Sequence, residues 1–200
     1  RRMRLHKLYD IHWERPEPLV PRHLRLEVAG RVDPQGVEIT PLDEEAVRRA
    51  AQRLLNEGVE SIAICFINAY ANGAHERRAQ ALVEEIAPNI HISISSNVLP
   101  EIREYERTSS TVINAYVRPI VDAYFRSMEN DNQALGLDIP IMVMQSNGGM
   151  IPSEIARQIP IHIIESGPAA GVTGAYRPAR QMGVENVITL DMGGTTAKGA

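Results

Sequence analysis

The sequence predicts an α/β protein, and three observations support this prediction. Helix-like and strand-like segments alternate between residues 40 and 95, which is typical of crossover units around a largely parallel sheet. A long amphipathic stretch follows, and more strand-like segments come after it. The chain has 200 residues and 44% hydrophobic content, which is enough for one or two domains with packed cores.

The first helix is expected over residues 40–58. Thr40 is a candidate N-cap, Pro41 suits the first turn, and Asp43 follows Thr40 by three residues, as in a capping box. Gly58 is suited to end the helix. One face of this helix is apolar and consists of Leu42, Val47, Ala50, Ala51, Leu54 and Leu55.

A strand, a helix and a second strand are expected next. The apolar run 61–67 predicts a buried strand, and residues 74–87 predict a helix. In the run 89–95 the isoleucines alternate, as on one face of a strand. His75 and Glu76 begin the second helix, and we expect both at the surface.

A long amphipathic helix is expected from Pro100 to about Asn130. Its apolar residues fall three and four apart: Ile102, Tyr105, Val112, Ile113, Tyr116, Val117, Ile120, Val121, Tyr124, Phe125 and Met128. Pro119 leaves two alternatives, one long helix or two helices that meet at the proline. The charged start of this stretch, as far as Arg107, is interpreted as a solvated helix face. We expect a domain boundary close to this start.

Three further strands and one helix are expected in the last third of the chain. The strands are 139–145, 159–164 and 186–192, and the helix 167–183 connects the last two. In "MQSNGGM" the Asn-Gly pair between apolar stretches predicts a hairpin. The alternative is a loop that faces a substrate or nucleotide, in which the polar contacts come from Gln145, Ser146 and Asn147.

Two glycine-rich stretches have the residue types of an anion site. In "ITLDMGGTTAKGA" a strand runs into Asp191, Gly193 and Gly194, and two threonines follow. Glycines let backbone N–H groups approach a phosphate, and an aspartate at a strand end can hold Mg²⁺ beside it. The alternative is a tight hairpin turn. "ESGPAAGVTGAY" begins a helix that either faces an anion or uses its small residues for close packing.

Charge and cysteine content narrow the classes of partner and compartment. The net charge of −4 and the pI of about 5.9 argue against nucleic acid and anionic membranes. The basic run "RRMRLHK" at the start is interpreted as a solvated tail. The single cysteine, Cys65, has no partner for an internal disulfide, which favours a reducing, cytoplasmic compartment. Its apolar neighbours predict a buried, unreactive thiol.

Six stretches of this sequence together resemble one known family. In their order and spacing, "ERPEPLVPRHLRLEV", "NAYANGAHERR", "SNVLPEIREYERTSSTVINAYVRP", "MQSNGGM", "ESGPAAGVTGAY" and "ITLDMGGTTAKG" are similar to the hydantoinase A / 5-oxoprolinase family, which includes the beta-type subunits of acetone and acetophenone carboxylases. The resemblance implies an actin-like ATPase (ribonuclease H-like) architecture. It places the end of the N-terminal domain at 1–107 and the beginning of the hydantoinase A domain at 108–200.

The resemblance also implies an activity, cofactors and a partner. The expected activity is ATP-dependent hydrolysis of a cyclic amide, a hydantoin or 5-oxoproline, with ATP and Mg²⁺ as cofactors and a hydantoinase B-type partner subunit or domain. Two alternatives are a subunit of an ATP-dependent ketone carboxylase and a structural module that is inactive alone. By resemblance Asp191 is the catalytic, Mg²⁺-binding residue. The phosphates of ATP would contact Gly193, Gly194, Thr195, Thr196, Ser166 and Gly167.

The sequence departs from the family pattern after the paired glycines. Many relatives have Thr-Ser-Thr-Asp there, whereas this chain has Thr195, Thr196, Ala197 and Lys198, so one acidic metal contact is missing. Because the segment stops shortly afterwards, we expect the turn 191–196 to lack its return strand.

Overall fold

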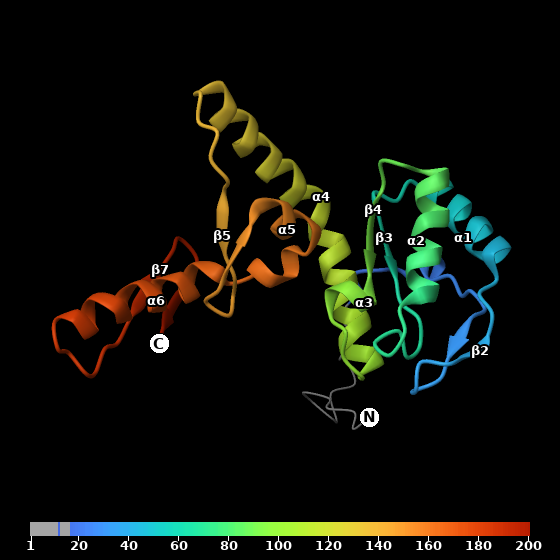
Figure 1. Cartoon of the computed structure of the whole chain (residues 1–200), viewed down its shortest axis with the longest axis horizontal. Helices are drawn as coiled ribbons and strands as arrows, with labels where there is room; N and C mark the ends of the chain where they lie inside the picture. The colour runs from blue at the N-terminus through green and yellow to red at the C-terminus, as the bar shows by residue number, and fades with distance from the viewer. Residues whose placement is uncertain (1–11, 13–16) are drawn as a thin grey trace.

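The computed structural model describes His12 and residues 17–200. Figure 1 shows an elongated arrangement, with an α/β unit at one end, the long helix α4 (Glu104–Ala134) crossing the middle, and α6 (Ser166–Gln181) at the other end. The basic run expected to be a solvated tail lies outside the described residues. Two short segments open the described chain: the 3₁₀ helix η1 (Arg22–Leu24) and the antiparallel pair β1 (Arg31–Val32) and β2 (Glu38–Thr40).

The α/β unit is built on two parallel strands joined by a crossover helix. Strand β3 (Ser61–Ile64) pairs in parallel with β4 (His91–Ile94), and α2 (Ala74–Ile86) connects them. Helix α1 (Glu44–Asn56) packs on α2, and α4 lies on the other side of the two strands (Figure 1). The core consists of Val47, Ala51, Ile62, Ala79, Leu82, Val83, Ile92 and Ile94. This confirms the predicted strand–helix–strand order.

Helix α1 begins later than its sequence predicts. The N-cap is Asp43 instead of Thr40, and Asp43 Oδ1 accepts a hydrogen bond from the Ala46 N–H at 2.9 Å. A side-chain oxygen of aspartate satisfies one of the free N–H groups of the first turn as well as threonine does. Thr40 instead ends strand β2, so pairing with β1 decides where the helix starts.

Three residues expected at the surface are buried, namely His75, Glu76 and Arg107. The Glu76 carboxylate accepts hydrogen bonds from the Ser95 hydroxyl at 2.5 Å and from the Phe66 and Ser96 N–H groups at 2.8 and 2.7 Å. The Arg107 guanidinium donates to Ser95 Oγ at 3.1 Å and to the Phe66 carbonyl at 2.9 Å. Burial of Glu76 and Arg107 is tolerated because both charges are hydrogen-bonded. His75 Nε2 pairs with Glu38 Oε2 at 2.6 Å, whereas its Nδ1 has no hydrogen-bond partner among the described residues.

Helix α4 is one continuous helix that contains Pro119. Its first half packs on β3, β4 and α3 (Ser95–Val98), and its second half contacts α5 (Ser153–Gln158). Half of the predicted apolar face is exposed, because the buried side of α4 is partly polar. Tyr116, Ile120 and Tyr124, one turn apart, are 62%, 74% and 60% exposed.

The buried polar side of α4 includes Asn114, which connects two parts of the chain. Its Nδ2 donates to Ser93 Oγ in β4 at 2.9 Å and to the Gln158 carbonyl at 3.2 Å. Its Oδ1 accepts from the Ile161 N–H at 3.1 Å. The side chain is fully buried. Asn114 therefore joins strand β4 to the segment that follows α5.

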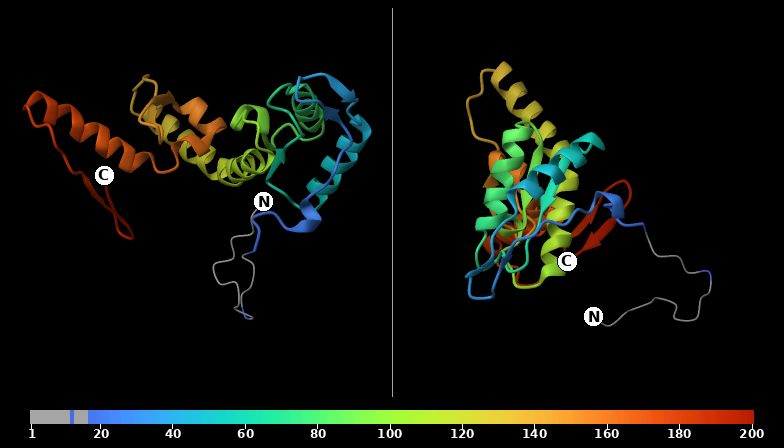
Figure 2. Two further views of the ribbon diagram at one scale, coloured as in Figure 1. Left: turned by 90° about the horizontal axis from the view of Figure 1, so that it is seen from below. Right: turned by 90° about the vertical axis from the view of Figure 1, so that its right-hand side faces the viewer.

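The last third of the chain contains two hairpins and α6. Strand β5 (Met142–Met144) pairs antiparallel with β6 (Met150–Pro152), which confirms the hairpin predicted at "MQSNGGM". Strand β7 (Leu190–Met192) pairs antiparallel with β8 (Ala197–Gly199), so the return strand expected to be missing is present. The left view of Figure 2 shows α6 and this hairpin together at the C-terminal end.

The prediction of a strand at residues 159–164 is wrong, because Pro160–Ile163 form the 3₁₀ helix η2. Proline has no N–H for a sheet, and the Ile161 N–H is taken by the Asn114 side chain. The parallel pairing expected from residues 40–95 is confirmed by β3–β4, whereas the other three strand pairs among the described residues are separate and antiparallel.

Among the described residues, no helix combines the length and apolar character that crossing a membrane requires.

Candidate functional site

The three stretches singled out in the last third of the sequence meet at residues 162–166. The Ser146 hydroxyl, in the β5–β6 loop, donates to the His162 carbonyl at 3.0 Å and also to the Ile164 carbonyl. The next residue, Glu165, forms an ion pair with Lys198 of strand β8. Helix α6 begins immediately afterwards, at Ser166. The β5–β6 loop, the α6 N-terminus and the β7–β8 hairpin are thus linked through side chains.

The β5–β6 loop owes its shape to its two glycines. Gly148 has φ +86°, a left-handed conformation that glycine adopts without strain. A Cβ on Gly149 would lie 2.9 Å from Gln145 Oε1 and 3.2 Å from Asn147 Oδ1, so the two carboxamides lie close over its Cα. Asn147 Oδ1 also accepts from the Gly149 N–H at 2.9 Å. The loop therefore holds two carboxamides side by side.

A cavity of about 230 Å³ opens beside this loop. Its lining comes from two segments, the loop itself and η2, and consists of Gln145, Ser146, Asn147, Ile161 and His162. The three residues that the sequence suggested as substrate contacts thus line one cavity together. His162 was not singled out by the sequence. The local signal was misleading, because "IPIHII" predicts a strand, whereas the 3₁₀ turn brings His162 to the loop.

The N-terminus of α6 is unusual in its backbone and in its packing. The N-cap residue Glu165 has φ +66°, a left-handed conformation that is costly for a residue with a side chain. Such strain is concentrated at functional sites. A Cβ built on Gly167, Gly171 or Gly174 would meet no atom within 4 Å. Close packing within the described chain therefore does not explain these glycines.

The turn between β7 and β8 presents its residues to solvent. Residues 191–196 are all exposed, and the turn closes with a hydrogen bond from the Gly193 N–H to the Thr196 carbonyl at 2.9 Å. A Cβ on Gly194 would meet nothing within 4 Å. Asp191 lies directly opposite Lys198 in the hairpin register, so both side chains point to the same face. Lys198 thus pairs with Glu165 and is the cross-strand neighbour of Asp191.

These residues fit a phosphate-binding role in two respects. The space over Gly194 and Gly167 is open, which leaves backbone N–H groups accessible to an anion. The exposed Asp191 carboxylate is free to hold a hydrated Mg²⁺, which keeps several waters and takes one or two carboxylates. Among the described residues no group of three or more His, Cys, Asp or Glu side chains could hold a metal by itself.

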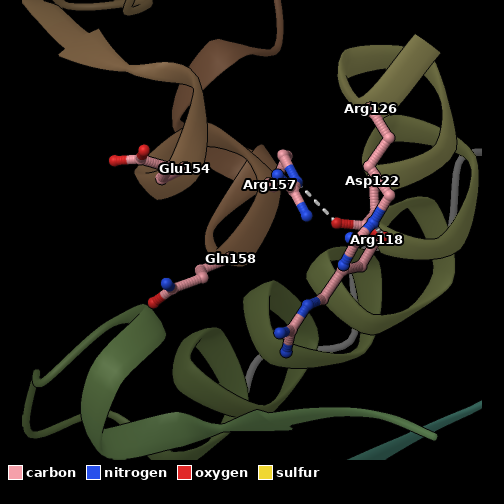
Figure 3. Close-up of a pocket in the computed structure, with 6 residues that line it drawn as sticks. All are labelled: Arg118, Asp122, Arg126, Glu154, Arg157 and Gln158. Carbon is pink, nitrogen blue, oxygen red and sulfur yellow. Dashed lines mark hydrogen bonds and ion pairs between the residues drawn. The ribbon is translucent and has the colours of Figure 1, made fainter. Parts of the chain in front are cut away.

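A second cavity, of about 260 Å³, lies between α4 and α5 (Figure 3). Asp122 accepts from Arg126 and Arg157, both at 2.7 Å, and Arg157 also donates to Glu129 at 2.9 Å. Burial opposes ionisation of Asp122, but the hydrogen bonds from the two arginines outweigh it and hold the Asp122 pKa below its usual value. Burial lowers the pKa of Arg118, whose guanidinium donates to the Ile92 carbonyl. Because acids and bases are paired here, this cluster ties α5 to α4.

Two family models match most of the chain. The model of the hydantoinase/oxoprolinase N-terminal region matches residues 1–87, and the model of hydantoinase/oxoprolinase matches residues 107–199. Only residues 88–106 and Ala200 lie outside both matches. The chain belongs to the hydantoinase/oxoprolinase family.

Individual relatives agree with this assignment. Caprolactamase subunit alpha of Pseudomonas jessenii is 39% identical over 188 residues, which are 94% of this chain and 27% of that subunit. The crystal structure of ATP-dependent caprolactamase from the same organism matches with a TM-score of 0.82 at 39% identity, over 94% of this chain and 27% of that one. Nucleotide-free acetone carboxylase matches with a TM-score of 0.82 at 31% identity, over 92% of this chain and 26% of that one. The chain thus spans about a quarter of the length of these relatives.

Proposed function

We propose that this chain is the central segment of an ATP-dependent cyclic-amide hydrolase subunit. Two relatives at 39% identity are, by their names, a caprolactamase subunit and an ATP-dependent caprolactamase, which act on a cyclic amide. We further propose the actin-like architecture for the whole subunit, with the domain division between residues 107 and 108. That division falls in the first turn of α4. A hydantoinase B-type partner and a cytoplasmic location are parts of the same proposal.

In this proposal the chain's own residues bind and orient the phosphates. The N–H groups of the 193–196 turn and the start of α6 at Ser166 and Gly167 would donate to phosphate oxygens. Asp191 would hold Mg²⁺ beside them, and the Thr195 and Thr196 hydroxyls would add donors. Bound Mg-ATP would supply a transferable phosphoryl group that converts a poorly reactive amide into a good electrophile. The positive charge of Lys198, next to Asp191, would favour the anion further.

The observation that carries this proposal is the open space over Gly194. No contact in the described chain requires a glycine at this position. Gly194→Ala should leave the melting temperature of the full-length protein unchanged, because the new Cβ meets nothing within 4 Å. It should raise KM for ATP at least tenfold, because the methyl group would occupy the approach of the phosphate. Steady-state ATP hydrolysis with a cyclic amide present measures this effect.

The matched control is Gly199→Ala, in the return strand of the same hairpin. A Cβ there would meet only the Thr189 carbonyl, at an ordinary contact distance of 3.8 Å. KM for ATP should stay within twofold of the wild-type value. An unchanged KM in a folded Gly194→Ala protein would contradict the phosphate site.

A second candidate function is ketone carboxylation. The match to acetone carboxylase, with the same TM-score of 0.82, favours it over other ATP-dependent reactions. The full-length protein with its partner distinguishes the two. Hydrolysis of ATP that depends on a lactam or hydantoin supports the amide hydrolase, whereas hydrolysis that depends on acetone and bicarbonate supports the carboxylase.

A further inference from the structure

The cavity between the β5–β6 loop and η2 contains polar groups that nothing in the described chain satisfies. The Gln145 carboxamide is half-buried, and the described residues offer it no hydrogen bond. The His162 ring likewise makes no hydrogen bond there: the backbone N–H of His162 donates to the Ile159 carbonyl, and its carbonyl accepts from Ser146. Both side chains are half-buried, so their polar groups remain accessible from the cavity. Polar groups that line a cavity and have no partner in the described chain are available to a ligand.

The position of the Gln145 carboxamide is set by its own loop. Its oxygen lies close over Gly149, where a Cβ would come within 2.9 Å. The neighbouring Asn147 uses its oxygen to accept from the Gly149 N–H, which leaves its NH₂ group free to donate. The Ser146 hydroxyl is occupied by two carbonyls and fixes the loop to η2. The loop thus presents one complete carboxamide and one additional donor.

From this geometry we propose that the cavity binds the amide edge of a cyclic amide, with Gln145 as the specificity-determining residue and His162 as a second polar partner. The proposal rests on the proposed function. A ring forces its amide to be cis, so that the N–H and the C=O lie side by side. A carboxamide carries the same pair of groups, and the two can exchange two parallel hydrogen bonds. The volume of about 230 Å³ suits a small ring, and Ile161 supplies an apolar contact for its carbons.

Adenine also has a donor and an acceptor side by side, so the nucleotide base is a competing occupant. The contacts that connect the cavity to neighbouring segments favour the cyclic amide as its occupant. Ser146 contacts the Ile164 carbonyl, one residue before Glu165, which pairs with Lys198 next to the proposed phosphate turn. These contacts connect the cavity to the residues proposed to bind the phosphates, whereas the base would lie a triphosphate and a ribose away from those residues.

The test uses the full-length subunit with its partner and three probes: ε-caprolactam, 5-oxoproline and hydantoin. Binding without ATP is measured by saturation-transfer NMR titration, and ATP hydrolysis is measured separately. Gln145→Leu should weaken binding of the tightest probe at least tenfold while KM for ATP stays within twofold. In Gln145→Glu the side chain keeps its shape but loses the NH₂ donor, so binding of the tightest probe should weaken as well. The control is Gln133→Leu, at an exposed glutamine on α4, which should change neither value.

An N-methylated form of the tightest probe tests the pairing directly. Because it lacks the N–H but keeps the C=O, it should bind the wild type more weakly than the parent probe, and Gln145→Leu should weaken its binding by less than that of the parent probe. Three results would overturn the proposal. A folded Gln145→Leu protein could bind the probe as tightly as the wild type does, or it could change only the KM for ATP. The third is that none of the three probes binds the wild type. Probe binding that depends on Gln145, without probe-dependent ATP hydrolysis, would contradict the proposed function and support the cavity. Probe-dependent ATP hydrolysis that does not change in Gln145→Leu would support the proposed function and contradict the binding of the cyclic amide in this cavity.

Discussion

Asp191 lies at the end of strand β7, exposed and opposite Lys198. In the full-length enzyme, Asp191→Asn should lower ATP hydrolysis at least a hundredfold, because loss of one preorganised electrostatic group typically costs 10²–10³ in kcat, about 2.7–4 kcal/mol. Asparagine keeps the size and most hydrogen bonds, so the fold should change little. Steady-state ATP hydrolysis and thermal melting of both proteins measure the two effects.

The opposite outcome has an equally simple physical reason. If Asp191 serves only the turn, asparagine is as good a turn former and activity should barely change. Near-normal turnover in a normally folded Asp191→Asn protein would therefore refute the metal-binding role of this residue.

Cys65 follows directly after strand β3, and burial raises the pKa of its thiol to about 11, with the nearby Glu76 carboxylate acting in the same direction. Because only the thiolate reacts, labelling by a mild thiol reagent at pH 8 should be at least a hundredfold slower in the native protein than in urea. The rate should rise about tenfold per pH unit up to pH 10. Rapid native labelling at pH 8 would show that the thiol is accessible.

At the scale of elements, the Arg107 side chain ties α4 to the α/β unit. Arg107→Met removes the buried hydrogen bonds to the Ser95 hydroxyl and to the Glu101 and Phe66 carbonyls. Hydrogen bonds to a charged group contribute about 1.5–3 kcal/mol each, so the free energy of unfolding should fall by about 3–5 kcal/mol. Arg103, the residue before α4, is exposed, so Arg103→Met is the matched control. It should change the free energy of unfolding by less than about 0.5 kcal/mol. Urea titrations followed by circular dichroism compare the two variants. Equal stabilities would mean that the network contributes nothing.

The elements that the sequence predicts well are those with local causes. Helices α1 and α2 and strands β3 and β4 follow from apolar periodicity and turn residues, and the β5–β6 hairpin follows from Asn147-Gly148. The failures have distant causes. Glu76 finds partners nineteen and twenty residues away, at Ser95 and Ser96, and segment 159–164 is held as a 3₁₀ turn by Asn114. The local sequence around a charged residue does not reveal partners that lie so far away along the chain.

The candidate site shows the same division. The sequence singles out Gln145, Ser146 and Asn147 because a glycine-rich loop with polar residues is visible in it, and the three residues line one cavity. Their role as substrate contacts stays a prediction. His162 and Glu165 were missed, since neither a 3₁₀ turn nor a left-handed non-glycine residue leaves a local signal. The roles proposed for Asp191 and the phosphate-facing residues remain predictions.

At the scale of the whole molecule, the 200-residue chain alone should bind Mg-ATP weakly or not at all. The chain spans about a quarter of its relatives, and the proposed phosphate turn is exposed on a three-residue hairpin with no opposing wall among the described residues. Isothermal titration calorimetry should give a Kd well above the micromolar range. Micromolar or tighter binding would mean that this segment already contains a complete nucleotide site.

The three hydrogen bonds of Asn114 have a mechanical consequence. A fully buried carboxamide joins β4 to Gln158 and Ile161 and so couples the α/β unit, α4 and η2 directly. Helix α4 has 31 residues and is about 46 Å long, at 1.5 Å per residue. A bend within α4 would therefore displace its C-terminal end over a large distance. We therefore expect any opening and closing around the candidate site to bend the chain after Ile163, where Glu165 already holds a strained conformation. The cavity would then travel with the α/β unit, and the phosphate turn would swing toward it with α6.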